Sequence, residues 1–219
     1  MSRLLIAASL VAALATSVFA SEQRFAAPPP DVATMGARAD LPVDSVERRM
    51  ILDRATVRAK LAEQRTANLS RFRAYQKAGV FPSNTFDTRK LNVWMDADGH
   101  LCAAATIISA SGQSDLVARV ASQSNFIRLA DMRQGPLMDW ILTSGLTQDE
   151  IAAIQEPFMP VYQEQPVVEP KLRAAENARL IKKYKQVTAM IVKNQKKSLE
   201  LAVDRLMKNQ ELAWKLVNG

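Results

Sequence analysis

Two long stretches without proline do most to limit what this chain can fold into. They cover residues 45–78 and 171–219, and the second begins directly after Pro170 and runs to the last residue. Both are rich in Ala, Arg, Lys, Gln and Leu, which have high helix propensity. Apolar side chains recur along both at roughly the spacing of a helix. The sequence therefore predicts a predominantly helical protein with a long basic helix near its N-terminus and a basic helical tail.

The first of these stretches has recognisable helix ends. A side-chain oxygen of Asp44 or Ser45 can cap the first turn, and Gly79 is a natural stop at the C-terminal end. The apolar stripe of this helix is narrow, and Arg54 and Arg65 interrupt it. Because most of the remaining surface is charged, we expect the helix to lie on the outside of the fold.

The tail carries two apolar seams, which the basic segment KNQKKS (residues 193–198) separates. The first seam consists of Leu180, Tyr184, Val187 and Ile191, and the second of Leu199, Val203, Leu206, Ala213 and Val217. The sequence leaves open whether the tail is one continuous, coiled-coil-like helix or folds back at the basic segment as a helical hairpin. Because a lone helix would expose both seams to water, we expect the tail to self-associate or to bind a helical protein partner.

Residues 79–160 are predicted to form a compact central module. Two apolar runs, residues 91–95 and 100–108, flank Asp96–Gly99 (DADG), and Asp-Gly between apolar runs is a strong signal for a β-hairpin. Short helices are predicted at about residues 114–121, 136–144 and 148–155. The predicted fold class is therefore α+β, with a small β-hairpin module that the long helix and the helical tail flank.

The first 20 residues have the pattern of a secretory signal peptide. Arg3 precedes an apolar run that ends in small residues, so we expect cleavage after Ala20 and export to the periplasm or the extracellular space. The apolar core is short for a membrane span, and a retained N-terminal anchor is the alternative. Residues 21–44 are predicted to be a flexible proline-rich leader, and residues 161–170 a proline-containing linker. No later stretch predicts a transmembrane span.

The turn around Gly99 could instead hold a cation. A calcium loop needs oxygen ligands at alternating positions in its first half, a glycine in its middle and a glutamate at its end. Counted from Gly99, the first position of such a loop is Trp94 and the last is Ala105, neither of which provides the required side chain. The sequence therefore predicts a turn at this place, and it predicts no metal and no cofactor for the chain.

His100 and Cys102 are the only histidine and the only cysteine of the chain. Two residues apart on a predicted strand, they would share one face and could form a catalytic Cys–His pair. A structural zinc site needs about four such ligands, which this chain lacks. Because Cys102 precedes the apolar run AAATII, we predict that it is buried and acts as a small apolar residue. The common hydrolase, nucleotide-binding and zinc-protease motifs are absent from the sequence.

Charge is unevenly distributed along the chain. Residues 45–78 carry a net charge of +6, residues 79–170 of −6 and residues 171–219 of +8. Most of the charge of the tail comes from Lys182, Lys183, Lys185, Lys193, Lys196 and Lys197. These lysines could bind an anionic surface weakly, whereas nucleic acid is not expected because Tyr184 is the only aromatic residue among them. We favour a tail that docks on the acidic centre, since the short linker keeps the two close.

These patterns predict an exported protein without catalytic activity. It would be a binding or scaffold protein of the cell envelope or the extracellular space, and it would act through its helices. The alternative is a small hydrolase-like enzyme that uses the central module around His100 and Cys102.

Overall fold

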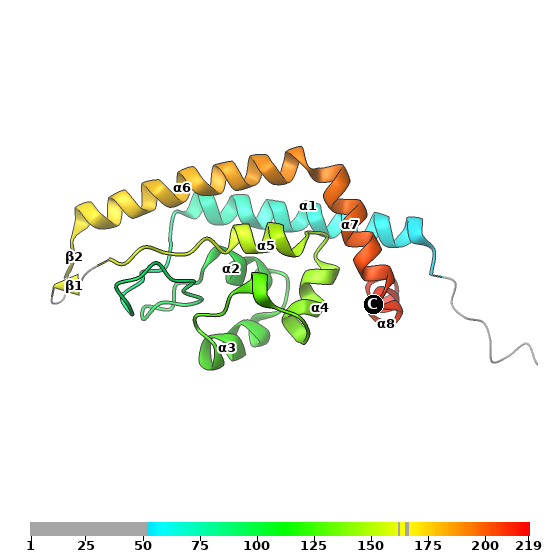
Figure 1. Ribbon diagram of the computed structural model, residues 1–219, viewed down its shortest axis with the longest axis horizontal. Helices are drawn as coiled ribbons and strands as arrows, with labels where there is room; N and C mark the ends of the chain where they lie inside the picture. Colours follow the sequence, from blue (N-terminus) through cyan, green and yellow to red (C-terminus); the bar gives the residue numbers. More distant parts are fainter. Residues whose placement is uncertain (1–51, 162, 165–166) are drawn as a thin grey trace, which may run out of the picture. The chain divides into compact units, whose positions relative to one another are not determined.

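Eight helices make up most of the described part of the chain in this computed structural model (Figure 1). The structure describes residues 52–161, 163–164 and 167–219. In chain order the helices are α1 (Arg54–Ala78), α2 (Ala103–Ala110), α3 (Ser114–Gln123), α4 (Pro136–Thr143), α5 (Gln148–Ile154), α6 (Pro170–Lys193), α7 (Gln195–Met207) and α8 (Gln210–Asn218), and a 3-10 turn, η2 (Leu129–Asp131), precedes α4. The predicted signal peptide, the predicted leader and residues 45–51 lie outside the described residues.

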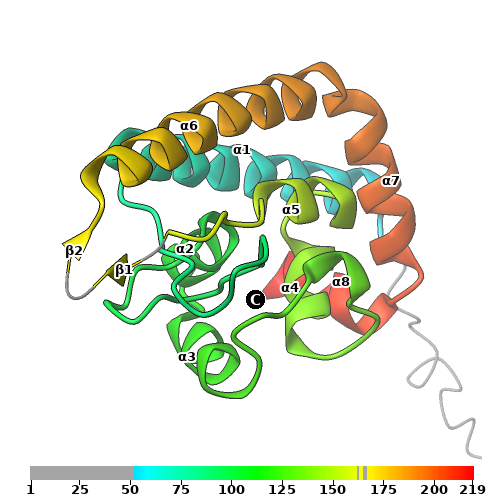
Figure 2. The same cartoon turned by 60° about the vertical axis from the view of Figure 1, so that its left-hand side comes forward.

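Helix α1 starts and stops at capping residues. The side chain of Asp53 accepts hydrogen bonds from the backbone N–H groups of Ala55 and Thr56 (3.2 and 2.9 Å), and Gly79 follows the helix with a φ of +66°. α1 packs against α2, α6, α7 and α8 (Figure 2), while many of its other residues are exposed, so it is a surface helix that is covered along one side. Its buried face is wider than its apolar residues suggest, because Arg65 is buried with them.

The fold is helical rather than α+β, and the predicted class and β-hairpin are wrong. Residues 103–108 of the predicted second strand belong to α2 (Ala103–Ala110), and the two predicted strands share only an isolated bridge between Met95 and Leu101. The strands of the described residues are β1 (Gln163–Glu164) and β2 (Val167–Val168), a two-residue antiparallel pair just before α6.

The error has a local physical cause. A short apolar run is compatible with a buried helix or a buried strand, and three consecutive alanines at 103–105 favour the helix. Cys102 caps this helix, because its Sγ accepts a hydrogen bond from the backbone N–H of Ala105 at 3.4 Å. The turn before it does form: the backbone N–H of Gly99, whose φ is +83°, donates to the carbonyl of Asp96 at 3.1 Å.

The tail divides into three helices and is neither a continuous helix nor a helical hairpin. α6 ends at Lys193, the chain turns at Asn194, and α7 leaves at a steep angle (Figures 1 and 2). The first seam belongs to the main core, next to Phe72 and Tyr75 of α1. The residues of the second seam pack against Val57 and Leu61. Both seams are thus covered within one chain, although self-association of the tail remains a prediction.

A buried ion pair joins α1 to α5 and to the end of α6. The guanidinium of Arg65 donates two hydrogen bonds to the carboxylate of Glu150, at 2.7 and 2.8 Å. It also donates to the backbone carbonyls of Gly145 and Ile191, each at 3.0 Å. The side chains of Arg65 and Glu150 are only 2% and 5% exposed. Three segments that are distant in the sequence therefore meet at one side chain.

No helix within the described ranges combines the length and the apolar character that are needed to cross a membrane. α6 is long enough for a span by its number of residues, but its sequence is strongly basic.

Candidate functional site

A groove with a volume of about 510 Å³ opens between α1 and α2. Its first wall is one face of α1, where Arg71, Ala74, Tyr75 and Ala78 follow one another at the i, i+3, i+4 and i+7 spacing of a helical face. The two alanines leave space because their side chains are short. The hydroxyl of Tyr75 donates to the backbone carbonyl of Leu101 at 3.3 Å, which connects this wall to the opposite one.

The opposite wall consists of the loop before α2 and one face of that helix. Gly99, His100 and Leu101 contribute from the loop, and Thr106 and Ala110 lie one turn apart on α2. The groove is therefore mainly apolar, with Arg71 and His100 as its two basic side chains. A volume of this size lies within the range of about 300–1,000 Å³ that is typical of small-molecule sites.

Asp96 holds the loop in place. One of its carboxylate oxygens accepts from the backbone N–H groups of Asp98 (3.0 Å) and His100 (2.8 Å), and the other from the backbone N–H of Ser83 at 2.9 Å. The second oxygen also lies 3.1 Å from Nδ1 of His100. Because a carboxylate only accepts hydrogen bonds, Nδ1 donates here, and Nε2 is the ring nitrogen that remains for a ligand.

The same loop also brings three possible metal ligands together. The ligand atoms of Asp96, Asp98 and His100 lie within 4.8 Å of one another. The hydrogen bonds to Asp96 explain its position without an ion, because they satisfy both of its oxygens. The prediction that the chain binds no metal and no cofactor remains a prediction.

Cys102 and His100 do not form the pair that the sequence suggested. His100 lines the groove and is partly exposed, whereas Cys102 is fully buried at the start of α2 and does not line the groove. Burial raises the pKa of the Cys102 thiol to about 12. Since the thiolate is the nucleophilic form of cysteine, this position is poorly suited to catalysis at neutral pH.

We expect Cys102 to react with a thiol reagent only after the protein is denatured. The folded protein buries the sulfur and holds its pKa well above neutral pH, so both access and thiolate formation are suppressed. Labelling of native and of denatured protein, followed by mass spectrometry, measures the difference. A Cys102→Ala variant, which has no other thiol, is the control. Rapid labelling of native protein would contradict the buried position.

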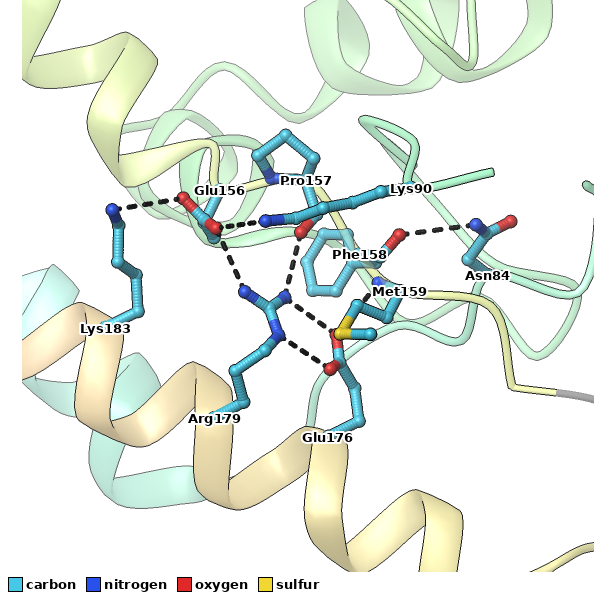
Figure 3. A network of polar contacts seen from close by, with 9 residues as sticks. All are labelled: Asn84, Lys90, Glu156, Pro157, Phe158, Met159, Glu176, Arg179 and Lys183. Atoms are coloured by element: carbon cyan, nitrogen blue, oxygen red, sulfur yellow. Dashed lines mark hydrogen bonds and ion pairs between the residues drawn. The ribbon is translucent and has the colours of Figure 1, made fainter. Parts of the chain in front are cut away.

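The six lysines predicted as an anionic site have different surroundings. Lys183 alone has an acidic partner among the described residues: its Nζ lies 3.8 Å from Oε2 of Glu156 (Figure 3). Glu156 also pairs with Lys90 (2.8 Å) and Arg179 (3.0 Å). Burial raises the pKa of Glu156, but hydrogen bonds from Lys90 and Arg179 outweigh burial, so its pKa lies below the ordinary value.

The network in Figure 3 attaches α6 to the segment that follows α5. Arg179 donates to both carboxylate oxygens of Glu176 (2.7 and 2.8 Å) and to the backbone carbonyl of Pro157 at 2.9 Å. Glu176 in turn accepts from the backbone N–H of Met159 at 2.9 Å. The tail therefore docks on the acidic centre through Arg179 and Lys183. The other five predicted lysines, Lys182, Lys185, Lys193, Lys196 and Lys197, are exposed.

The residues of the groove wall on α1 were not predicted as site residues. Ala74 and Ala78 are exposed alanines on a charged helix, and Arg71 is one of many basic residues there. Two alanines one turn apart on a helix indicate either that another element packs closely against them or that they line a hollow. Only the position of α2 shows that they line a hollow. Of the residues in the groove, His100 was the one that the sequence indicated.

Comparisons of the chain with protein-family models, with curated proteins and with solved structures found no match.

Proposed function

We propose that this chain is an exported, non-catalytic binding protein that takes a small, mainly apolar ligand with an acidic group in the groove between α1 and α2. The observation that carries the proposal is the groove itself, which combines apolar walls with one arginine. The signal-peptide pattern of residues 1–20 motivates export.

Arg71 is the reason for an acidic group on the ligand. Its Nη1 donates to the amide oxygen of Asn68 at 2.7 Å, which holds the side chain at the groove without neutralising it. None of the ion pairs within the described residues involves Arg71. A guanidinium has several donors and binds carboxylates through two of them at once. A ligand carboxylate would therefore complete the contacts of Arg71 while an aliphatic chain covers Ala74 and Ala78.

A hydrolase is the second candidate, and the Asp96–His100 pair favours it. In that function Nε2 of His100 would act as a general base at the edge of the groove. However, the side-chain partner of His100 among the described residues is Asp96, and no serine, threonine or cysteine that could act as the nucleophile is hydrogen-bonded to it there. Cys102 is buried. Turnover of carboxylate esters that is lost in His100→Ala and retained in Cys102→Ala would favour this candidate over binding alone.

We expect the mature protein to bind decanoate, as a probe, more tightly than decanol, and we expect Ala78→Phe to weaken both. In Ala78→Phe, the phenyl ring would fill the space beside Ala74. Arg71→Gln should reduce decanoate binding by about tenfold. A hydrogen bond to a charged group contributes roughly 1.5–3 kcal/mol, and the lower value applies because the groove is partly open to water. Isothermal titration calorimetry measures both affinities.

The control for the groove is Ala59→Phe, which places the same ring at an exposed position of α1 outside the groove. This variant should bind both probes like the wild type. Absence of binding to either probe, or equal binding by Ala78→Phe, would contradict the proposed function.

A further inference from the structure

The outer face of α6 carries lysines that the docking of the tail leaves free. Lys182, Lys185 and Lys193 are exposed, and none of the ion pairs between described residues includes them. The positive charge of this face is thus not neutralised by the acidic centre, in contrast to that of Lys183 and Arg179.

Helical periodicity explains why these three lysines point away from the core. The buried residues of α6, among them Leu180, Tyr184, Val187 and Ile191, follow the i, i+4, i+7 and i+11 spacing of one face. Lys182, Lys185 and Lys193 recur at i, i+3 and i+11 on the opposite face. In Figures 1 and 2, α6 runs along one edge of the described helices, so this face has no helix beyond it.

Large apolar side chains lie beside the lysines. On α6, Ile181 lies one turn before Lys185 and Val192 lies two turns after it, and the two apolar side chains are 36% and 45% exposed. Lysines next to exposed apolar side chains on a helix are typical of helices that lie on an anionic membrane surface.

We propose that the outer face of α6, defined by Ile181, Lys182, Lys185, Val192 and Lys193, binds the surface of an anionic phospholipid bilayer. The ammonium groups would contact lipid phosphates, and the two apolar side chains would enter the boundary between headgroups and acyl chains. A soluble polysaccharide would use the lysines but offers no apolar phase for Ile181 and Val192. The three lysines span about 16 Å along the helix, at 1.5 Å per residue, so one flat surface can contact all of them.

The neighbouring basic residues Lys196 and Lys197 are not included in this face. Both lie on α7, beyond the turn at Asn194, and Lys197 lines a hollow together with Asp149 of α5. The proposal therefore rests on Lys182, Lys185 and Lys193 of α6, and none of the ion pairs within the described residues includes them.

Cosedimentation of the mature protein with vesicles tests the proposal. We expect binding to vesicles of phosphatidylcholine and phosphatidylglycerol, and none to vesicles of phosphatidylcholine alone. Raising the salt concentration should weaken the binding, because exposed charges are screened over about 8 Å at physiological ionic strength. Each lysine near an anionic membrane contributes roughly a fivefold factor, so K182Q/K185Q/K193Q should reduce partitioning by about a hundredfold.

Two further variants make the result specific. The triple variant K60Q/K77Q/K208Q removes the same charge from other elements and should bind like the wild type. I181S/V192S should reduce vesicle binding but leave any binding to heparin unchanged. Equal binding by K182Q/K185Q/K193Q and the control triple variant would overturn the proposal, as would binding to heparin without binding to anionic vesicles. Circular dichroism of each variant verifies that the helices are retained.

Discussion

Replacing Gly145 with alanine is expected to prevent folding or to lower the free energy of unfolding by about 4 kcal/mol or more, which is exceptional for the addition of one methyl group. Gly145 lies between α4 and α5 and has a φ of +73°. An added Cβ would lie 2.0 Å from the carbonyl oxygen of Leu61 and 2.7 Å from the backbone nitrogen of Arg65. Both contacts are with the backbone of α1, so no side-chain rotation can relieve them.

The chain offers a matched control for the backbone conformation alone. Gly79 and Gly112 have φ values of +66° and +92°, but a Cβ at either position would meet no atom within 4 Å. Alanine at these positions should therefore show only the cost of a left-handed backbone, about 1–2 kcal/mol. Urea unfolding of the three variants, followed by circular dichroism, measures the difference. A Gly145→Ala variant as stable as Gly112→Ala would show that α1 and the loop before α5 are not in close contact.

Local signals in the sequence were sufficient to predict several helices. α5 begins with a capping box: the hydroxyl of Thr147 accepts from the backbone N–H of Glu150 at 3.2 Å, and the Glu150 carboxylate accepts from the backbone N–H of Thr147 at 2.9 Å. Gly79 at the end of α1 is a second such signal. These features act over three or four residues, so they can be recognised in the sequence.

The arrangement of the helices could not be predicted in the same way. The sequence predicts a strand over most of α2, because the apolar run there has no period that excludes a strand. In the sequence, Arg65 only interrupts an apolar stripe, because its partner Glu150 is 85 residues away. The groove depends on the position of α2 beside Ala74 and Ala78, which is a property of the packing and not of either helix alone. His100 stands out in the sequence as the only histidine of the chain, but its place at the edge of the groove follows from the hydrogen bonds that Asp96 accepts.

The second large effect is expected for Arg65→Met, which should lower the free energy of unfolding by about 3–5 kcal/mol. Methionine retains much of the apolar stem of arginine but leaves the carboxylate of Glu150 buried without its cation. The carbonyls of Gly145 and Ile191 also lose their donor. Because the total stability of a domain is roughly 5–15 kcal/mol, this loss would be a large fraction of it. Urea unfolding at constant pH measures the change.

An exposed ion pair of α1 provides the comparison. Arg58 lies 2.6 Å from Glu200 of α7, and both side chains are nearly half exposed. Arg58→Met should cost only a small fraction of the loss seen for Arg65→Met, since water solvates the carboxylate that remains. Arg54 also lies 3.0 Å from Glu200, so this carboxylate keeps a cation after the replacement. The difference between the variants therefore reports the burial of Glu150 together with the loss of its cation.

The double variant Arg65→Met/Glu150→Gln shows which part of the loss comes from the unpaired charge. Glutamine preserves the capping box at Thr147 but carries no charge, so the double variant should be more stable than Arg65→Met alone. If it is equally unstable, the loss arises from the two carbonyls and the packing around them. If Arg65→Met is as stable as Arg58→Met, the carboxylate of Glu150 has access to water, and the junction of α1, α5 and α6 is looser than the hydrogen bonds of Arg65 indicate.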